Sequence, residues 1–267
     1  MAQTVILLIT GAVNISAFKI PYTRLTDPKV RLQQYLDSLE YAIEHYHRVN
    51  HIVFCENTGY EYDYLQLQEK AVQKGKTLEV ISFQGNYPFI ETKGKGYGEG
   101  EIIEYALKKS KTLQESDFFY KLTGRIIVKN MDRVMDSTRS DNTFIFVADL
   151  KKRFEKGRIR TLLYKVNTSL YKQKLIDAYT EVDDFKNHYL EHAFYIRLAD
   201  MPASSFGRYP DFAGIQATTG KIYQSKLKFI KYCLYNYLGF YSNRRKSLVQ
   251  KIILQIVKTF RFAIFQV

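Results

Sequence analysis

Short clusters of small and polar residues follow four apolar runs in the first half of the chain. In open α/β sheets, ligands bind beyond the carboxyl ends of the strands, so four such clusters would line one edge of a sheet. Turn chemistry alone also favours glycine and asparagine there, so no single cluster is informative. The clusters are Thr10, Gly11 and Asn14 after the first run, Glu56, Asn57 and Gly59 after the second, Gln84, Gly85 and Asn86 after the third, and Thr123, Gly124 and Arg125 after the fourth. The candidate donor-binding residues among them are Thr10, Gly11, Asn14, Glu56, Asn57, Thr123, Gly124 and Arg125.

Residues 93–101 (KGKGYGEGE) have the composition of an anion-binding loop that leads into a helix. Alternating glycines let backbone N–H groups approach a ligand, the N-terminus of a helix favours an anion, and two lysines add positive charge. The segment suits a diphosphate but matches neither the P-loop nor the dinucleotide fingerprint, and a flexible structural loop is the alternative. The candidate contacts are Lys95, Gly96, Gly98 and Glu99, of which Glu99 is also explained as a helix-dipole partner.

Strand and helix patterns alternate over the first 125 residues, which predicts a mostly parallel sheet with helices on both faces. Continuous β-branched and aromatic runs are typical of buried strands. The expected strands are 4–10, 51–55, 78–83, 118–122, 143–148 and 160–166, and the expected helices are 28–47, 62–74, 98–109, 169–179 and 185–198. The first helix is expected to bury Val30, Leu32, Leu36, Leu39 and Ile43, and a loop is expected over 208–220.

The charge of the chain is concentrated at one end. The formal net charge is +13, but residues 212–267 contain ten Lys or Arg and no Asp or Glu, so the first 211 residues carry 30 minus 27, or +3. Cys55 and Cys233 form no disulfide framework, and the five histidines make no metal pattern with a cysteine, which favours a reduced, cytoplasmic protein. No basic segment precedes the first apolar run, so we expect no signal peptide.

Residues 247–260 (SLVQKIILQIVKTF) predict an amphipathic helix, because Ser247, Gln250, Lys251, Gln255 and Lys258 share one stripe. A wide apolar face bordered by basic residues is typical of a helix in a bilayer interface, and the uncharged run is shorter than the roughly 18 residues of a span. We expect the basic aromatic tail, residues 221–267, to bind an anionic membrane surface. The alternatives are a helix packed on the core, a homo-oligomer contact and nucleic-acid binding, although we expect no nucleic-acid partner because no module signature is present.

Four segments, VFCENTGY, KGYGEGEIIEYAL, FYKLTGR and YLEHAFY, resemble bacterial capsule and O-antigen glycosyltransferases with a GT-A-type fold. Within that family they look most like the galactofuranosyltransferase-like group. The resemblance covers roughly residues 3–220 and implies a GT-A-like domain over 1–220, followed by the tail. It further implies a UDP-linked sugar donor, with UDP-galactofuranose as the candidate, a lipid-linked glycan acceptor and a position on the inner face of the plasma membrane.

One segment departs from the family pattern. Where the general fold carries an Asp-x-Asp motif for a divalent metal and the donor diphosphate, this chain has Thr123-Gly124-Arg125. Arg125 would offset the diphosphate charge directly, because a guanidinium matches phosphate geometry. Lys121, in the same segment, is a further donor-site candidate. The metal requirement stays open, because Asp149 is either a candidate metal ligand or a simple turn residue. The alternative role of Arg125 is a surface ion pair.

An inverting transferase needs a carboxylate base about 3 Å from the acceptor hydroxyl. Glu191 is the candidate base because its apolar and aromatic neighbours indicate a half-buried helix, where desolvation raises a carboxyl pKa; Asp149 is the second choice. The candidate acceptor contacts are Arg158 and Arg160, which are spaced to share one strand face, and His192. Each of these candidates has an alternative interpretation. Glu191 is then a structural residue of the helix, Arg158 and Arg160 lie on a solvated strand face, and the spacing of His188 and His192 is incidental.

Two other classes of function remain open from the sequence. One is another nucleotide-dependent transferase, such as a nucleotidyl or phosphoglycerol transferase. Such an enzyme should carry paired carboxylates for magnesium near its phosphates, and the strand ends here lack them. The other is a non-enzymatic membrane- or RNA-binding module, which would bind no donor nucleotide.

Overall fold

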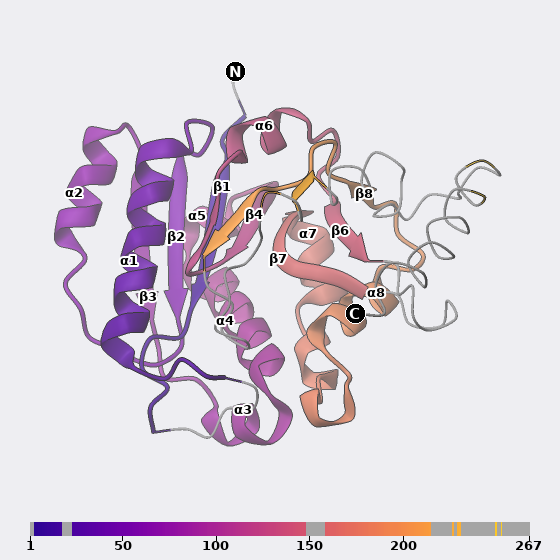
Figure 1. Ribbon diagram of the computed structural model, residues 1–267, viewed down its shortest axis with the longest axis horizontal. Coiled ribbons are helices and arrows are strands. Elements are labelled where there is room, and N and C mark those ends of the chain that lie inside the picture. The colour runs from indigo at the N-terminus through magenta and orange to yellow at the C-terminus, as the bar shows by residue number, and fades with distance from the viewer. Residues whose placement is uncertain are drawn as a thin grey trace.

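The computed structural model describes residues 3–17, 23–147 and 158–214, together with five isolated tail positions: Lys226, Phe229, Ile230, Val249 and Ile252. A seven-stranded sheet runs through the centre of the molecule in the order β3-β2-β1-β4-β7-β6-β8 (Figure 1). The chain therefore starts in the middle of the sheet, moves outward to one edge, and then returns to the other side of β1.

Four parallel strands form the first half of the sheet. They are β1 (Ile6–Gly11), β2 (His51–Glu56), β3 (Thr77–Ser82) and β4 (Phe118–Thr123), and each matches a predicted strand to within about two residues. The apolar runs of β1, β2 and β4 are buried because helices cover both faces of a parallel sheet, whereas in the edge strand β3 only Leu78 is buried. Since β1 pairs in parallel with both β2 and β4, the carboxyl ends of these strands meet at one edge.

The second half of the sheet is mixed. Strand β7 (Arg158–Asn167) is antiparallel to β4 and to β6 (Thr143–Val147), and β8 (Ser204–Ser205) pairs in parallel with β6. A separate two-stranded sheet joins β5 (Ile126–Val128) to β9 (Phe212–Gly214), so a strand lies inside the stretch predicted as a loop. The predicted fold class, α/β with a mostly parallel central sheet flanked by helices, is confirmed.

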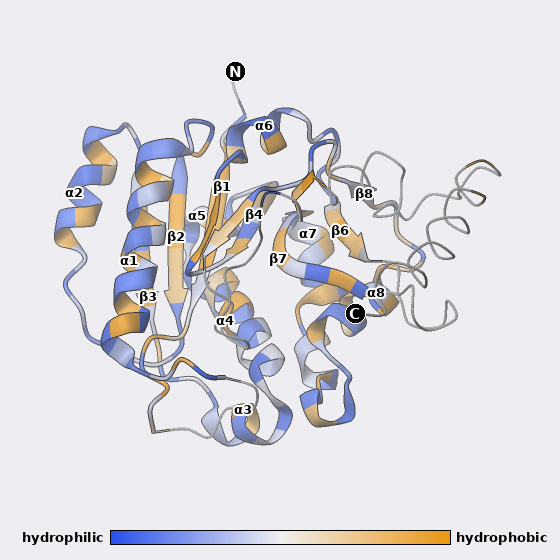
Figure 2. Cartoon of the chain, in the orientation of Figure 1, coloured by the Kyte–Doolittle hydropathy of each residue, from blue (hydrophilic) through white to orange (hydrophobic). Residues whose placement is uncertain are grey.

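Alternate residues of β1 point into two separate cores. Leu7 and Ile9 pack in a cluster with α1 (Pro28–His45) and α2 (Leu65–Gln73), whereas Ile6 and Leu8 pack with α4 (Lys95–Lys109) and α8 (Leu190–Arg197). Figure 2 shows the strands as mostly hydrophobic and the outer sides of α1 and α2 as hydrophilic. In the part of the chain that the structure describes, no helix has the length and hydropathy needed to cross a bilayer.

The buried face of α1 differs from the predicted one. Asp27 caps the helix N-terminus and Pro28 occupies its first turn, as the sequence suggests. The fully buried residues, however, are Arg31, Tyr35, Ser38, Leu39, Ala42 and Ile43, and Val30 is 43% exposed. The predicted burial of Leu39 and Ile43 is confirmed, and Leu32 and Leu36 are partly buried against the core, whereas the prediction for Val30 is wrong because polar residues take part of the inner face.

The glycine-rich segment is also different from the prediction. Helix α3 (Tyr87–Lys93) ends at Gly94, and α4 begins directly at Lys95 instead of the predicted 98, so Gly96 lies inside the helix together with Gly98 and Gly100. A Cβ at Gly96 would crowd Val182 and Leu190, and one at Gly100 would overlap Tyr179. These glycines let α4 approach its neighbours closely, and tertiary packing outweighs their low helix propensity.

The remaining helices are short. They are α5 (Lys111–Gln114), α6 (Met131–Asp136), α7 (Thr168–Leu170), a π-helical turn (Tyr171–Leu175) and two 3₁₀ turns (Ala178–Glu181 and Asp184–Lys186). The helix predicted over 169–179 is thus divided into three conformations. The helix predicted from 185 starts only at Leu190, because the preceding residues form a small turn closed by the Asp183–His188 bridge. Helix α2 starts at Leu65, later than the predicted 62.

Candidate active site

A cavity of about 430 Å³ opens at the carboxyl ends of β1 and β4. This position is the topological switch point of the sheet, where one connection leads from β1 toward β2 and another returns to β4, and ligands of open α/β sheets bind there. Twelve of the predicted site residues line it: Thr10, Gly11, Asn57, Lys95, Gly98, Glu99, Thr123, Gly124, Arg125, Arg158, Arg160 and Glu191. The structure therefore brings together residues that are up to 181 positions apart (191 minus 10).

Five other predicted residues do not line this cavity, namely Asn14, Glu56, Gly96, Lys121 and His192. Glu56 is fully buried and accepts hydrogen bonds from the backbone N–H groups of Thr58 (2.9 Å) and Tyr60 (3.0 Å), so it shapes the turn after β2. Nδ1 of His192 accepts the N–H of Tyr189 at 3.2 Å and so caps α8. Both side chains have structural tasks in the described residues.

An acidic side chain of the same chain lies at the N-terminus of α4, while Lys95, Gly98 and Glu99 of the predicted phosphate contacts line the cavity. The carboxylate of Asp184 accepts hydrogen bonds from the backbone N–H groups of Lys95 and Gly96. Asp184 is 2% exposed, and burial raises its pKa while these N–H groups oppose the shift. An acidic side chain of the same chain thus takes the place that an anionic ligand would occupy, and Gly94, at φ 106°, lies directly against it.

A fully buried lysine lies beneath the cavity. Nζ of Lys121 forms an ion pair with Glu99 and donates to Oγ1 of Thr123 (2.8 Å) and the carbonyl of Thr161 (2.8 Å). Burial lowers the pKa of Lys121, and the nearby carboxylates of Glu99 and Glu191 oppose that shift. Glu99 is therefore a partner of Lys121 more than a helix-dipole residue, and its negative charge is already compensated.

Glu191 lies in the first turn of α8 and reaches the cavity. Desolvation raises the pKa of its carboxyl group, the neighbouring anions Glu99 and Asp184 add to that effect, and Lys95 opposes it. No described cation forms an ion pair with Glu191. Two carboxylates in one cavity thus have different environments, since Glu99 is paired and Glu191 is not.

Two polar residues of α1 that the sequence analysis did not predict, Arg31 and Tyr35, also line the cavity. Arg31 is 4% exposed and donates from Nε to the carbonyls of Ala12 (2.9 Å) and Val13 (3.2 Å). The hydroxyl of Tyr35 accepts the N–H of Ala12 at 2.9 Å. Burial alone would raise the pKa of Tyr35, but the guanidinium groups of Arg31 and Arg125 hold it below its usual value. The spacing of Arg31, Tyr35 and Ser38 along α1 was the signal available in the sequence.

Arg125 has a backbone conformation that side chains rarely adopt. Its φ is 65°, in the left-handed region, and its Nε atom is buried with no hydrogen-bond partner among the described residues. Gly124 just before it approaches the carbonyl of Thr10 and the ring of Tyr35 so closely that a Cβ would overlap both. Strained positions of this kind cluster at ligand sites. The turn after β4 therefore directs an incompletely bonded guanidinium into the cavity.

Strand β7 supplies two further arginines. Because β7 runs antiparallel to β4, its first residues lie beside the carboxyl end of β4, which brings Arg158 and Arg160 to the cavity. Arg160 donates to the hydroxyl of Tyr209 at 2.8 Å. Arg158 is exposed, and no described carboxylate forms an ion pair with it.

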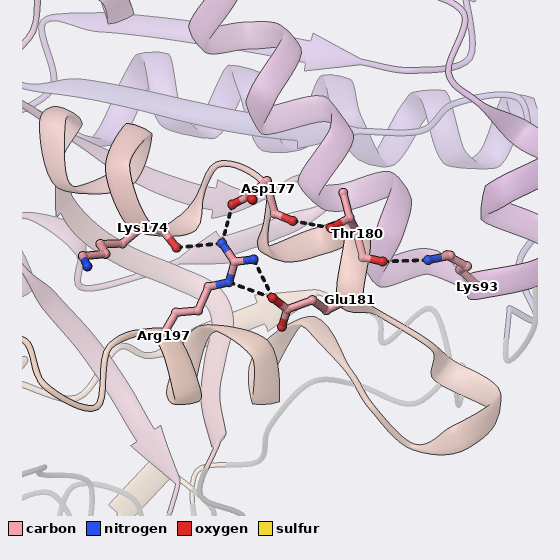
Figure 3. Close-up of polar contacts among 6 residues, drawn as sticks. All are labelled: Lys93, Lys174, Asp177, Thr180, Glu181 and Arg197. Atoms are coloured by element: carbon pink, nitrogen blue, oxygen red, sulfur yellow. Dashed lines mark hydrogen bonds and ion pairs between the residues drawn. The ribbon is translucent and has the colours of Figure 1, made fainter.

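An ion-pair cluster holds α8 against the preceding helical turns. Arg197 pairs with Asp177 and Glu181 and donates to the carbonyl of Lys174 at 3.1 Å (Figure 3). In the same view, Lys93 at the end of α3 donates to the carbonyl of Thr180 at 2.6 Å. The Arg197 bonds connect α8, which carries Glu191, to the preceding helical turns, and the Lys93 bond connects those turns to α3.

The described residues do not fit a divalent metal. No three His, Cys, Asp or Glu side chains in the described ranges gather as metal ligands. Arg125 presents a cation after β4, and in the described residues the only carboxylates on the cavity wall are Glu99, which is paired with Lys121, and Glu191. Asp149, the other candidate ligand, lies outside the described residues.

No protein-family model matches the chain, and no curated protein matches it. Among solved structures it is similar to the apo form of the glycosyltransferase GlyE from Streptococcus pneumoniae TIGR4, with a TM-score of 0.48 and 11% identity over 76% of this chain and 45% of that one. It is also similar to a UTP-bound UGPase from Acinetobacter baumannii (TM-score 0.41, 12% identity, 96% and 99% covered). The galactosyltransferase LgtC, in complex with donor and acceptor sugar analogs, gives a TM-score of 0.43 at 11% identity (71% and 69% covered). The chain thus spans less than half of the GlyE chain. At these TM-scores the function has to be argued from the cavity itself.

Proposed function

We propose that the protein is a glycosyltransferase that moves a sugar from a nucleotide-sugar donor to a glycan acceptor. The observation that carries this proposal is the composition of the cavity. It combines a cluster of guanidinium and ammonium groups at the switch point of the sheet with one half-buried carboxylate, Glu191, that lacks a described ion-pair partner. Glycosyl transfer from a diphosphate donor requires cations that bind the diphosphate and a desolvated base in the same cavity.

The donor diphosphate is proposed to bind at the ends of β1 and β4. Arg125 and Lys95 supply the charge, because both line this part of the cavity. Arg31 and Tyr35 hold the loop after β1 in place beneath that position. The small side chains in this part of the wall leave room for the nucleotide and its sugar; they are Thr10, Gly11, Gly98, Thr123 and Gly124.

Glu191 is proposed to act as the general base in a direct displacement. The acceptor hydroxyl gives its proton to the Glu191 carboxylate while its oxygen forms a bond to the anomeric carbon of the donor sugar. The bond between that carbon and the diphosphate breaks, and the nucleoside diphosphate leaves with the electron pair. A single displacement inverts the anomeric configuration, and the raised pKa of Glu191 makes it a stronger base than an exposed carboxylate.

A finer proposal follows from the family resemblance and the tail. The donor would be UDP-galactofuranose or another UDP-sugar, and the acceptor a lipid-linked capsular or O-antigen glycan at the inner face of the plasma membrane. The tail supports this proposal because its ten basic residues are unopposed by acidic ones. Three of its described apolar side chains, Ile230, Val249 and Ile252, are 62%, 65% and 51% exposed, which suits contact with lipid.

The test is a calorimetric titration of the full chain with a panel of nucleoside diphosphates and nucleotide sugars, each with Mn²⁺ and with EDTA. We expect UDP or a UDP-sugar to bind, and binding in EDTA would assign the role of the metal to the cations of the cavity. If no member of the panel binds under either condition, the proposal is wrong, and a non-enzymatic function of the tail becomes the better explanation.

A further inference from the structure

Strand β4 carries a lysine where a buried strand of a parallel sheet normally has an apolar side chain. Phe119, Lys121 and Thr123 are alternate residues of β4, so their side chains lie on the same face of the sheet. Phe119 belongs to the core cluster that contains residues of α4 and α8, and Lys121 is fully buried on that face. Burial of an ammonium group is costly unless partners replace its water, so the partners of Lys121 indicate its role.

The ammonium group of Lys121 has three protons and three acceptors. Nζ forms an ion pair with Oε1 of Glu99 and donates at 2.8 Å to both the carbonyl of Thr161 and Oγ1 of Thr123. Because a lysine only donates, the hydroxyl oxygen of Thr123 is the acceptor in this bond. The proton of the Thr123 hydroxyl therefore remains available for a different acceptor.

The hydroxyl proton of Thr123 has only a distant acceptor among the described residues. Oε1 of Glu99 lies 3.4 Å from Oγ1 of Thr123, which exceeds the roughly 2.5–3.0 Å of an O–H···O bond. The same carboxylate oxygen is already bonded to Lys121. Since Thr123 lines the cavity, an oxygen of a bound ligand can take this proton at a shorter distance.

Lys121 also sets the charge of the cavity wall, although it does not line the cavity itself. Glu99 does line the cavity and is partly exposed there. When it is paired with Lys121, Glu99 adds no net charge to the wall; unpaired, it would repel a diphosphate and would accept the proton of Thr123. Lys121 thus influences a bound anion through two residues of the wall, Glu99 and Thr123.

We propose that Lys121 is a positioning residue for the donor: it neutralises Glu99 and holds the hydroxyl of Thr123 so that this hydroxyl donates a hydrogen bond to an oxygen of the donor diphosphate. The inference rests on the proposed function, because it takes the ligand at the end of β4 to be the diphosphate that Arg125 binds. Arg125 follows Thr123 by two residues, and both line the cavity.

The hydroxyl is tested by calorimetric titration of the full chain with UDP. Thr123→Val keeps the shape of the side chain but removes the hydroxyl, so UDP should bind about tenfold or more weakly, because a hydrogen bond to a charged group is lost. Thr123→Ser keeps the hydroxyl, so its affinity for UDP should stay within about threefold of the unmodified chain. Equal UDP affinity of Thr123→Val and the unmodified chain would overturn the proposal.

The role of Lys121 is tested by loss and rescue in the same titration. Lys121→Met should weaken UDP about tenfold or more, because Glu99 then carries an uncompensated charge and competes for the hydroxyl proton. Glu99→Gln added to that variant should restore the affinity to within about threefold, because the charge and the competition disappear together. A lysine that only supports the packing of the sheet would not be rescued at Glu99, so an unrescued loss would overturn the positioning role, as would Lys121→Met with unchanged affinity.

Lys165→Met is the matched control. Lys165 is another buried lysine of the sheet and pairs with Asp141 at 2.8 Å, but it does not line the cavity. Its loss should leave the affinity for UDP within about twofold. An equal loss in Lys165→Met would show that removing any buried lysine disturbs the cavity, and would contradict the role of Lys121. Lys121→Gln, which keeps an N–H donor without the charge, takes the place of Lys121→Met if the latter does not fold.

Failure of this inference is distinguishable from failure of the proposed function. If the unmodified chain binds no UDP, the proposed function is wrong and the role of Lys121 is wrong with it. If the unmodified chain binds UDP and Thr123→Val and Lys121→Met bind it equally well, the donor site stands and only the positioning role is wrong.

Discussion

Glu191 has the environment of a base because no described cation pairs with it. Glu99, in the same cavity, forms an ion pair with Lys121, whereas Glu191 has no ion-pair partner among the described residues. Position in the fold separates the two roles here, since the residue type is the same.

We predict that Glu191→Gln lowers transferase turnover by roughly 10²–10⁴-fold while the affinity for UDP is unchanged. The amide is close in shape to the carboxylate but accepts no proton. Turnover can be followed by release of the nucleoside diphosphate, and UDP affinity by calorimetry. Turnover that persists in this variant would remove Glu191 from the reaction.

The raised pKa of Glu191 also predicts a pH dependence of stability. A carboxyl whose folded-state pKa lies above its unfolded value favours the fold at low pH, and that contribution is lost as the pH rises through the folded pKa. The unmodified chain should therefore lose part of its stability across that interval relative to Glu191→Gln, which has no proton to lose. Thermal melting of both chains at several pH values measures the difference. If the melting temperatures of the two chains change in parallel with pH, the pKa of Glu191 is not raised.

We expect that Arg125 lowers the stability of the fold through its backbone conformation and that its side chain contributes to UDP binding. A non-glycine residue in the left-handed region costs about 1 kcal/mol, so Arg125→Gly should raise the melting temperature while weakening UDP binding by roughly tenfold or more. Arg125→Ala should weaken UDP to the same degree without the gain in stability, because alanine keeps the strain. A glycine variant with unchanged UDP affinity would show that Arg125 lies outside the donor site.

At the scale of elements, Gly96 and Gly100 let α4 pack closely against its neighbours, while Gly98 lines the cavity. The N–H groups at the start of this helix are bonded to Asp184, and Gly100 lies against Tyr179. A motif that combines glycine, lysine and a helix N-terminus has the composition of an anion site, but composition does not reveal which group will occupy that N-terminus. The nearby 3₁₀ turn (Asp184–Lys186) brings the occupant from about 90 residues further along the chain.

We predict that Gly100→Ala destabilises the fold by about 1–3 kcal/mol, which is the cost of overpacking. In an unconstrained helix interior the same change would stabilise by about 1 kcal/mol, so the sign of the effect is the test. Gly75→Ala is the matched control: its φ is 70° but nothing lies within 4 Å, so only the backbone cost should appear, without loss of UDP affinity. Chemical denaturation of both variants measures the free energies of unfolding, and a stabilised Gly100→Ala would show that α4 is not packed as described.

At the scale of the whole molecule, the chain joins a nearly neutral body to a strongly basic tail. Phe229 of the tail packs against the core cluster that contains Leu39 and Ile43, so removal of residues 221–267 would disturb packing as well as the proposed membrane contact. Charge substitutions separate the two effects. The arginine and lysine run at 244–246 provides three basic side chains in succession.

We predict that replacing Arg244, Arg245 and Lys246 by Gln lowers the affinity for anionic vesicles roughly 100-fold, at about 1 kcal/mol for each charge. Co-sedimentation with vesicles of phosphatidylglycerol and phosphatidylcholine measures this, and pure phosphatidylcholine is the reference. UDP binding should be unaffected, which shows that the body is intact. Equal sedimentation of both chains with the anionic vesicles would refute a membrane-binding tail.

The sequence by itself determined the elements of the first half of the fold. Buried parallel strands need continuous apolar runs, and those runs placed β1, β2, β3 and β4 to within about two residues. The same local rule predicted that Thr10, Asn57 and Thr123 follow the strands, and the parallel pairing then brings them to one edge. These features depend on a few adjacent residues, which is why they can be deduced without a structure.

Only the tertiary structure decided which polar residues act together. Arg31 and Tyr35 look like the solvated side of a helix until α1 is packed on the sheet, and Lys121 looks like a surface residue of a strand until Glu99 covers it. The capping of α4 by Asp184, the pairing of Glu99 and the freedom of Glu191 all join segments far apart in the chain. Electrostatic partners act through space, and their identity is set by how helices and strands pack, which local patterns do not encode.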